Sequence, residues 1–197
     1  MRQNSFEEEN LNKTIRKRRS KRAISEEEIT ETELKKLTGA AHLAPSCFNN
    51  QPWRFITVED AEKLERIKES LPEGNYWAKK APAIIAVVSR QDLDCELSRG
   101  RIYYKFDCGL AVENLLLQAT EMGLVAHPIA GFNQETTGEV LKIPEEFELL
   151  TLIIIGKPGS PEKLSEKHRK VEFGERKRVP LEKVTSKNEF NFDSPES

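Results

Sequence analysis

The chain has 197 residues, of which 37% are apolar and 32% are charged, and its formal net charge is −2. This length and apolar content fit one domain over residues 1–197 and exclude a wholly disordered chain. No apolar run approaches the ~20 residues that span a bilayer, and the acidic N-terminus lacks the pattern of a secretion signal. We therefore expect a cytoplasmic protein with no membrane partner.

The first predicted elements are helices. A polar helix is expected over about residues 6–18, and an amphipathic helix follows it and ends before Pro45. The second helix starts at Ser25 or at Thr30, because acidic residues follow each of them at positions typical of a first helical turn. The two starts remain open from the sequence alone.

Strands and helices alternate beyond Pro45. The expected elements are strands over residues 55–58, 83–88 and 150–155 and an amphipathic helix over residues 60–70. Strands embedded among helices in this way indicate an α+β or three-layer fold.

The helix expected over residues 106–122 carries apolar residues around nearly its whole circumference, and Gly123 is placed to end it. A helix of this kind is buried on all sides, which a domain of this size rarely achieves alone. We therefore expect an obligate dimer in which a second copy covers the outer face of this helix.

The near-zero net charge conceals two basic clusters. Seven of the 31 Lys and Arg residues lie within residues 13–22, and seven more lie within residues 163–178. Such runs indicate solvated surface arms, a nucleic-acid patch or an anion site, and composition does not choose among them. The net charge of −2 and the isoelectric point near 6.1 argue against nucleic acid.

The cysteines and histidines show no metal-ligand spacing. They are Cys47, Cys95 and Cys108, and His42, His127 and His168. An odd number of widely spaced cysteines is typical of a chain in a reducing compartment. We therefore expect no metal, and no redox role for Cys47.

Two stretches of sequence carry most of the functional information. The first reads Arg18-Arg19-Ser20-Lys21-Arg22, and the second, residues 45–53, reads PSCFNNQPW. In this order they resemble the signature of the nitroreductase family of FMN-dependent oxidoreductases. Residues 128–132, 152–159 and 176–180 resemble later segments of the same family, so that the similarity covers about residues 11–184 and leaves a polar tail over 185–197.

The resemblance implies a fold and an assembly. The family fold is α+β, with three layers (α-β-α), a mixed central sheet and an intertwined homodimer that holds the flavin at the subunit interface. It implies FMN as the cofactor and NADH or NADPH as the transient hydride donor.

The resemblance also implies three groups of cofactor-binding residues. The arginine group would hold the FMN phosphate and ribityl chain, since guanidinium forks form strong charge-assisted bonds to phosphate. The loop group would line the flavin from the partner subunit with amide donors and acceptors, and the third group would approach flavin N5 where a side chain would obstruct it. The groups are Arg18, Arg19, Ser20, Arg22, Arg176 and Arg178; Pro45, Ser46, Asn49 and Gln51; and Ala130 and Gly131.

The function implied is the passage of a hydride from NAD(P)H through flavin N5 to a nitroaromatic, a quinone or a similar small acceptor, by a ping-pong mechanism. The cofactor carries the difficult chemistry, and no catalytic acid or base is assigned to the protein. The alternatives are a flavin-binding or storage protein without turnover, a reductive dehalogenase-type flavoenzyme, and a nucleic-acid-binding module using residues 13–22.

Overall fold

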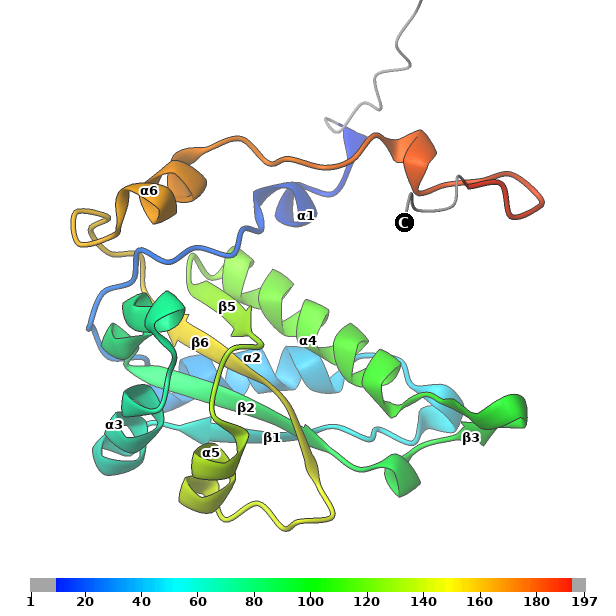
Figure 1. The fold of residues 1–197 in the computed structure, drawn as a ribbon, viewed down its shortest axis with the longest axis horizontal. Helices are drawn as coiled ribbons and strands as arrows, with labels where there is room; N and C mark the ends of the chain where they lie inside the picture. The colour runs from blue at the N-terminus through cyan, green and yellow to red at the C-terminus, as the bar shows by residue number, and fades with distance from the viewer. Residues whose placement is uncertain (1–9, 193–197) are drawn as a thin grey trace, which may run out of the picture.

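The computed structural model describes residues 10–192, which form a central sheet with helices on both faces (Figure 1). The strands in spatial order are β1 (Arg54–Val58), β2 (Ala83–Ser89), β6 (Glu148–Gly156) and β5 (Val125–Ile129), and a separate hairpin pairs β3 (Glu96–Leu97) with β4 (Arg101–Ile102). The α-helices are α1 (Lys13–Lys17), α2 (Glu31–His42), α3 (Ala61–Glu69), α4 (Tyr104–Glu121), α5 (Gln134–Leu141) and α6 (Glu166–Phe173).

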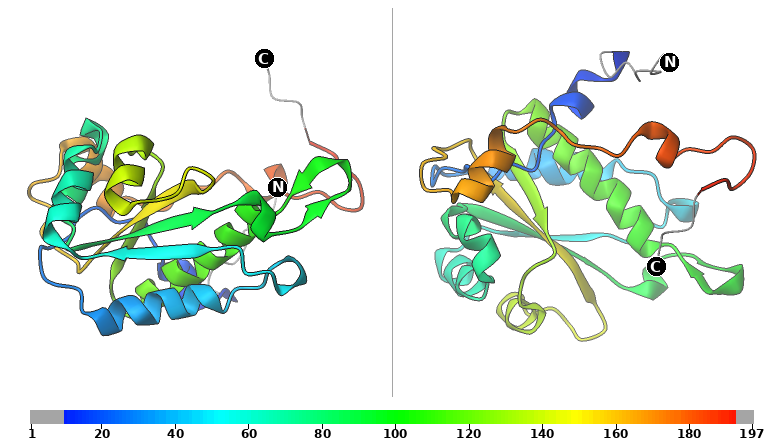
Figure 2. Two further views of the ribbon diagram at one scale, coloured as in Figure 1. Left: turned by 90° about the horizontal axis from the view of Figure 1, so that it is seen from below. Right: turned by 45° about the horizontal axis from the view of Figure 1, so that its top comes forward.

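The α+β class and the three layers are confirmed. Helices α2 and α4 cover one face of the sheet, and α3 and α5 cover the other (Figure 2). Alternate residues of β2 serve the two faces, as the period of a strand requires: Ile85 packs with Leu37 and Leu115, whereas Ile84 packs in the cluster of Ile67. The site-bearing segments are therefore mounted on a sheet whose two faces are both buried.

The sheet itself corrects the prediction of a mixed sheet. Each pair of neighbouring strands in the described part of the chain is antiparallel. The segment that contains α3 leaves β1 and enters β2 at the same end of the sheet, so these two strands are antiparallel. The segment that contains α5 connects β5 to β6 in the same way. The long helix α4 makes the crossover, from β2 to β5 on the far side of β6.

The predicted strands over residues 55–58, 83–88 and 150–155 and the predicted helices over 60–70 and 106–122 are present with small shifts at their ends. Strand β5 was not predicted, because His127 and Pro128 interrupt its apolar pattern. Pro128 is compatible with the sheet because β5 is an edge strand. The predicted start of the first helix at residue 6 lies outside the described residues, within which α1 occupies only Lys13–Lys17.

Helix α2 begins after Thr30, which decides between the two predicted starts. The Thr30 hydroxyl accepts from the backbone N–H of Glu33 at 3.2 Å, and the Glu33 carboxylate accepts from the Thr30 N–H at 2.8 Å. This reciprocal pair is a capping box. Ser25 instead lies in an extended segment beside residue 157.

Helix α4 is buried on the side that faces α2 and the sheet, where Ala111 and Leu115 are fully inaccessible to solvent. Its opposite side is less covered within one chain: Phe106 is 59% exposed, and Leu110 and Leu117 are half-buried. Gly123 follows the helix with φ +72°, as expected of a residue that ends it. None of the helices in residues 10–192 is both long and apolar enough to cross a membrane.

The last described segment, residues 174–192, is named here the C-terminal arm. After α6 it passes above α4 in Figure 1, and the right-hand view of Figure 2 shows it in front of that helix. Nearly all of its residues are exposed, including Val179, Val184 and Phe190 at 61%, 58% and 85%. The arm therefore carries apolar side chains that are exposed to solvent.

Candidate functional site

The basic segment, residues 18–22, is held in an extended conformation by the residues that follow it. Ile24 forms an isolated bridge with the chain just after β6, and the Gly159 N–H donates to the Ala23 carbonyl at 2.9 Å. A Cβ atom on Gly159 would lie 2.4 Å from the carbonyl carbon of Ile24. Only glycine permits this approach, so Gly159 determines how closely the residues after the basic segment pack against the chain that follows β6.

Glu172 of α6 fastens the same segment from the other side. Its side chain is buried and accepts from the backbone N–H of Arg22 at 2.8 Å and of Ala23 at 3.4 Å, with the Lys21 ammonium 3.9 Å away. A buried carboxylate is tolerated only where it is paired and hydrogen-bonded. Glu172 therefore shapes the backbone of the basic segment, a role for which the sequence offers no signal.

Arginine side chains join the two basic clusters through backbone carbonyls. Arg176 donates from Nη2 to the carbonyl oxygens of Arg16 at 2.8 Å and of Arg18 at 2.7 Å. Arg19 donates in the opposite direction, to the Gly174 carbonyl at 2.7 Å. The predicted meeting of the two ends of the chain is thus present in the structure, although Arg176 is engaged with the protein backbone.

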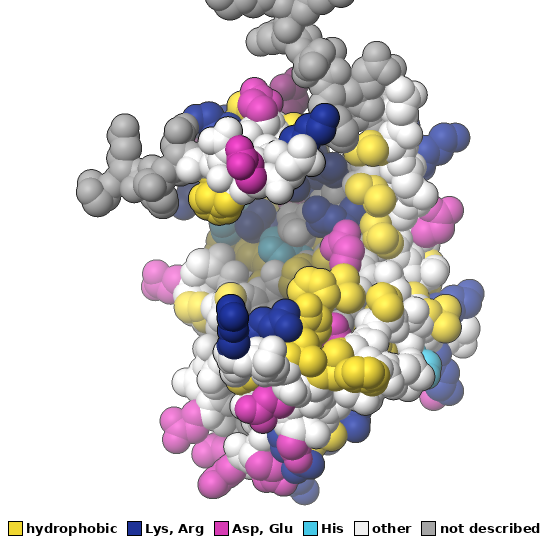
Figure 3. Space-filling model, turned by 90° about the vertical axis from the view of Figure 1, so that its right-hand side faces the viewer, with side chains coloured by type: hydrophobic (Ala, Val, Ile, Leu, Met, Phe, Trp, Pro, Cys, Tyr) yellow, Lys and Arg dark blue, Asp and Glu magenta, His cyan; other side chains and the backbone are white. Residues whose placement is uncertain are grey.

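The joined segments enclose a pocket with a strongly positive lining. Its residues are Arg18, Arg19, Ser20, Lys21, Arg22, Lys170, Val171, Gly174, Glu175, Arg176, Lys177 and Arg178. Eight of these are Lys or Arg and one is acidic. Figure 3 shows the hollow between the C-terminal arm and the body, with Lys and Arg side chains in its depth. A doubly charged phosphate fits this lining, because each guanidinium has more donors than its backbone bonds consume.

An aromatic layer supports the basic segment from β5. The Lys21 carbonyl accepts from Nδ1 of His127 at 2.9 Å, and the ring of Trp77 lies over that imidazole at 4.6 Å between centroids. The Arg22 guanidinium lies 5.9 Å from the Trp77 ring centre. Burial, followed by the nearby charges of Arg22 and Arg18, lowers the pKa of His127 to about 4. His127 is therefore neutral at pH 7 and supports the segment without adding charge.

Ala130 and Gly131 are exposed just beyond the end of β5. The Gly131 carbonyl accepts from Asn75 Nδ2 at 2.7 Å, and a Cβ atom on Gly131 would lie 3.1 Å from that nitrogen. Asn75 and Trp77 belong to the same short 3₁₀ segment (Glu73–Lys80), which therefore connects Gly131 with the basic pocket. The sequence contains Asn75 but does not indicate that it fixes Gly131.

The predicted loop group, which comprises Pro45, Ser46, Asn49 and Gln51, lies in another part of the chain. The polar loop, residues 45–51, is attached near the N-terminus of α4, where Asp107 accepts from the Cys47 N–H at 2.7 Å. The basic segment instead follows α1, in which Thr14 bonds to Glu121 at the far end of α4 at 3.0 Å. One chain thus brings Arg18, Arg19, Ser20, Arg22, Arg176 and Arg178 together, but separates them from Pro45, Ser46, Asn49 and Gln51.

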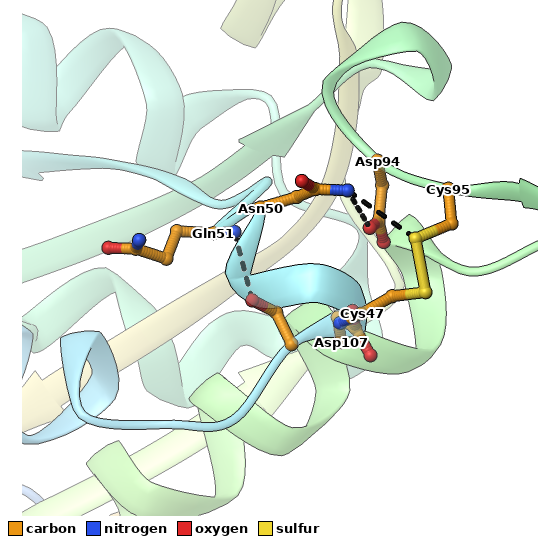
Figure 4. The surroundings of a disulfide bond; sticks show 7 residues. Cys47, Asn50, Gln51, Asp94, Cys95 and Asp107 are labelled. Carbon is orange, nitrogen blue, oxygen red and sulfur yellow. Dashed lines mark hydrogen bonds between the residues drawn. A yellow bond between two sulfur atoms is a disulfide. The ribbon is translucent and has the colours of Figure 1, made fainter.

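The polar loop is held in an unusual conformation by its own side chains. The Ser46 hydroxyl accepts from the Gln51 N–H at 2.9 Å, and the Gln51 side chain donates to the Asn49 carbonyl at 2.9 Å. Phe48, Asn49 and Gln51 have φ of 47°, 58° and 53°, in the left-handed region that non-glycine residues rarely occupy. In Figure 4 the Gln51 side chain points away from Asn50 and its neighbours.

A disulfide joins the polar loop to the segment before α4, a pairing that the widely spaced cysteines did not predict. Cys47 is bonded to Cys95, 48 residues away, with their Cα atoms 6.2 Å apart (Figure 4). The ligand atoms of Cys47, Asp94 and Cys95 lie within 4.8 Å of one another, but the disulfide engages both sulfurs. Cys108 is free and buried, and burial raises the pKa of its thiol to about 11.

Sequence comparisons find relatives over most of the chain. A model of the nitroreductase family matches residues 15–75 and 70–157. The chain is 32% identical over 155 residues to an Archaeoglobus fulgidus protein with the provisional name NADH dehydrogenase/NAD(P)H nitroreductase, covering 74% of this chain and 84% of that protein. It is 28% identical over 163 residues to the FMN reductase [NAD(P)H] of Bacillus subtilis, covering 75% and 65%.

A crystal structure described as an oxidoreductase containing FMN superposes with a TM-score of 0.82 at 31% identity, covering 98% of this chain and 97% of that one. The sequence match and the superposition span the sheet, the basic segment and the polar loop together. The chain belongs to the nitroreductase family.

Proposed function

We propose that this chain is an FMN-dependent oxidoreductase that passes a hydride from NADH or NADPH through flavin N5 to a nitroaromatic, a quinone or a similar small acceptor, in a ping-pong cycle. Relatives named FMN reductase and NAD(P)H nitroreductase support the flavin and the nicotinamide donor. The observation that carries the proposal is the basic pocket, in which eight cationic residues from the two ends of the chain face one small space.

The pocket residues divide into two tasks. Arg176 organises the backbone at Arg16 and Arg18, while Arg19 and Arg22 supply guanidinium donors for the phosphate. Ser20 is exposed within the same lining and adds a hydroxyl donor. When bound, FMN supplies the hydride chemistry. The contribution of the chain is to place the cofactor by its phosphate end.

The separation of the polar loop from the pocket supports a site shared between two copies of the chain. Within one protomer the loop cannot contribute to a ligand anchored at the basic segment, because the two attach to opposite ends of α4. Apolar side chains are available for a partner on α4, at the loop tip and along the arm. They include Phe106, Phe48, Val179, Val184 and Phe190. We propose a homodimer in which Ser46, Asn49 and Gln51 of one copy reach the flavin held by the other.

The decisive experiment is spectroscopic. The purified chain, loaded with FMN, is expected to lose its flavin absorbance when NADH or NADPH is added without oxygen and to regain it with a nitroaromatic or quinone. A chain that takes up no FMN would contradict the proposal. Bound FMN that neither nicotinamide bleaches would favour a storage protein, and selective turnover of halogenated phenols would favour a dehalogenase.

The phosphate assignment has its own control. Arg19→Ala is expected to weaken FMN binding about 10- to 100-fold, the loss typical of a charge-assisted hydrogen bond. Riboflavin lacks the phosphate, so its affinity should not change in this variant. Lys63→Ala, at an exposed position on α3, serves as the matched charge control. Equal losses for FMN and riboflavin would count against a phosphate role for Arg19.

A further inference from the structure

The Cys47–Cys95 disulfide joins two segments that approach each other only in the folded chain. Cys47 belongs to the polar loop, and Cys95 precedes the β3–β4 hairpin that leads into α4. The Cα separation of 6.2 Å lies within the range of ordinary disulfides. The bond therefore crosslinks the loop proposed to contact the flavin to a neighbouring hairpin.

The position of the polar loop depends on its contacts with the residues around the disulfide. Within the described residues, three hydrogen bonds connect the polar loop to the surroundings of the crosslink: Asn50 donates to Asp94 and to Cys95 Sγ, each at 3.4 Å, and the Cys47 N–H donates to Asp107. At the other end of the loop, Arg54 Nη1 donates to the Gln51 carbonyl at 3.1 Å. The loop is otherwise largely exposed, with Phe48 at 87%. Its left-handed residues persist only where the surroundings hold them.

The carboxylates of Asp94 and Asp107, beside the disulfide, favour release of the polar loop once the disulfide is reduced. Asp107 is only 2% exposed. The pKa of Asp107 is raised, first by burial and also by the nearby carboxylate of Asp94, while the Cys47 N–H acts in the opposite direction. One oxygen of Asp94 is buried without a hydrogen-bond partner among residues 10–192. Two crowded carboxylates are better solvated when the loop moves away and water enters.

We propose that Cys47–Cys95 is a reversible redox site at which reduction by a dithiol releases the polar loop and weakens FMN binding. The proposal rests on the function proposed above. A thiolate of the dithiol attacks one sulfur and forms a mixed disulfide, and its second thiol then displaces the other cysteine. The dithiol loses two electrons and becomes a cyclic disulfide, while the protein gains two electrons and two protons as the thiols of Cys47 and Cys95.

The test compares FMN affinity in the two states. FMN-free protein is titrated with FMN by fluorescence, either oxidised or reduced with dithiothreitol under argon, with thiols counted in each sample. If the released loop holds its binding geometry about one tenth of the time, the Kd for FMN rises about tenfold. The double variant Cys47→Ser, Cys95→Ser is expected to show the weaker affinity in both conditions. Cys108→Ala, which leaves the pair intact, is expected to keep the response.

A second readout separates this proposal from the proposed function. Amide hydrogen exchange of residues 44–53 is expected to accelerate on reduction, in the presence or absence of flavin, whereas exchange in β2 and β6 should not change. Wild-type protein with fully reduced thiols but unchanged FMN affinity and loop exchange would overturn the redox site. Absence of FMN binding in both states would contradict the proposed function, and accelerated loop exchange in the same samples would still support the crosslink.

Discussion

The guanidinium of Arg176 donates to the carbonyl oxygen of Arg18 at 2.7 Å, across 158 residues of sequence. The same nitrogen contacts the carbonyl of Arg16 at 2.8 Å, so one side chain orders the backbone on both sides of residue 17. Two like-charged segments would repel each other without such bonds. Their approach creates the concentration of positive charge that a phosphate can then neutralise.

This geometry predicts different effects for two substitutions of Arg176. Arg176→Ala should lower the free energy of unfolding by about 1.5–3 kcal/mol, the range for hydrogen bonds that involve a charged group, and should weaken FMN binding. Arg176→Lys keeps the charge but loses the planar fork, so it should resemble the Ala variant if backbone organisation dominates. Urea unfolding and FMN titration measure the two effects. A Lys variant with wild-type FMN affinity would instead assign Arg176 to direct phosphate binding.

The proposed dimer predicts the effect of removing most of the C-terminal arm. A chain that ends at Arg178 keeps the basic pocket but loses the exposed apolar residues Val179, Val184 and Phe190. It should be monomeric by light scattering, should fold, as judged by circular dichroism, and should bind FMN weakly. A full-length monomer with complete FMN occupancy would contradict the shared site.

His127 predicts a component of acid sensitivity. Its pKa is about 4 in the folded chain against an ordinary value of 6.5, so between these values the unfolded chain binds a proton that the folded chain excludes. The associated stability, up to about 3 kcal/mol, is present above pH 6.5 and is lost as the pH falls toward 4. His127→Gln should flatten the curve of unfolding free energy against pH in this window. His42→Gln, at an exposed position, is the control. If the curves of unfolding free energy against pH for His127→Gln and wild type are parallel, His127 is not the source of the acid sensitivity.

The start of α2 supplies a matched pair of substitutions. Thr30→Ala removes the hydroxyl of the capping box and should cost about 1 kcal/mol of stability. Ser25→Ala should change stability by less than about 0.5 kcal/mol, because the Ser25 hydroxyl has no hydrogen-bond partner within the described residues. Thermal or urea unfolding of the two variants tests this difference. A larger loss for Ser25→Ala would reverse the interpretation.

The parts of the fold that sequence predicted are those governed by local pattern. The uninterrupted apolar residues of β2 and the nearly all-apolar α4 are recognisable because burial determines their composition. Strand β5 was not predicted because it contains a histidine and a proline, which break the apolar pattern and which an edge strand tolerates. The antiparallel sheet could not be foreseen from the strands alone, since strand direction depends on where the connecting segments return.

The residues of the candidate site also fall into those that the sequence predicts and those that depend on tertiary contacts. The clusters that contain Arg19 and Arg176 are visible as runs of charge and as family motifs, and the structure places them together. Glu172, His127 and Asn75 act through single backbone contacts that depend on tertiary structure. The Cys47–Cys95 bond likewise depends on the distance between two segments in space, which their spacing in sequence does not reveal.

The contact between Gly159 and Ile24 also bears on the order of folding. The basic segment is synthesised well over a hundred residues before the residues that position it, Gly159, Glu172 and Arg176. Contacts between such distant residues form after local ones, because closing a long loop has a large entropic cost. A nascent chain can therefore build most of its sheet before it can retain a cofactor, and capture of a phosphate-bearing ligand would report that Arg176 has been synthesised and has reached the basic segment.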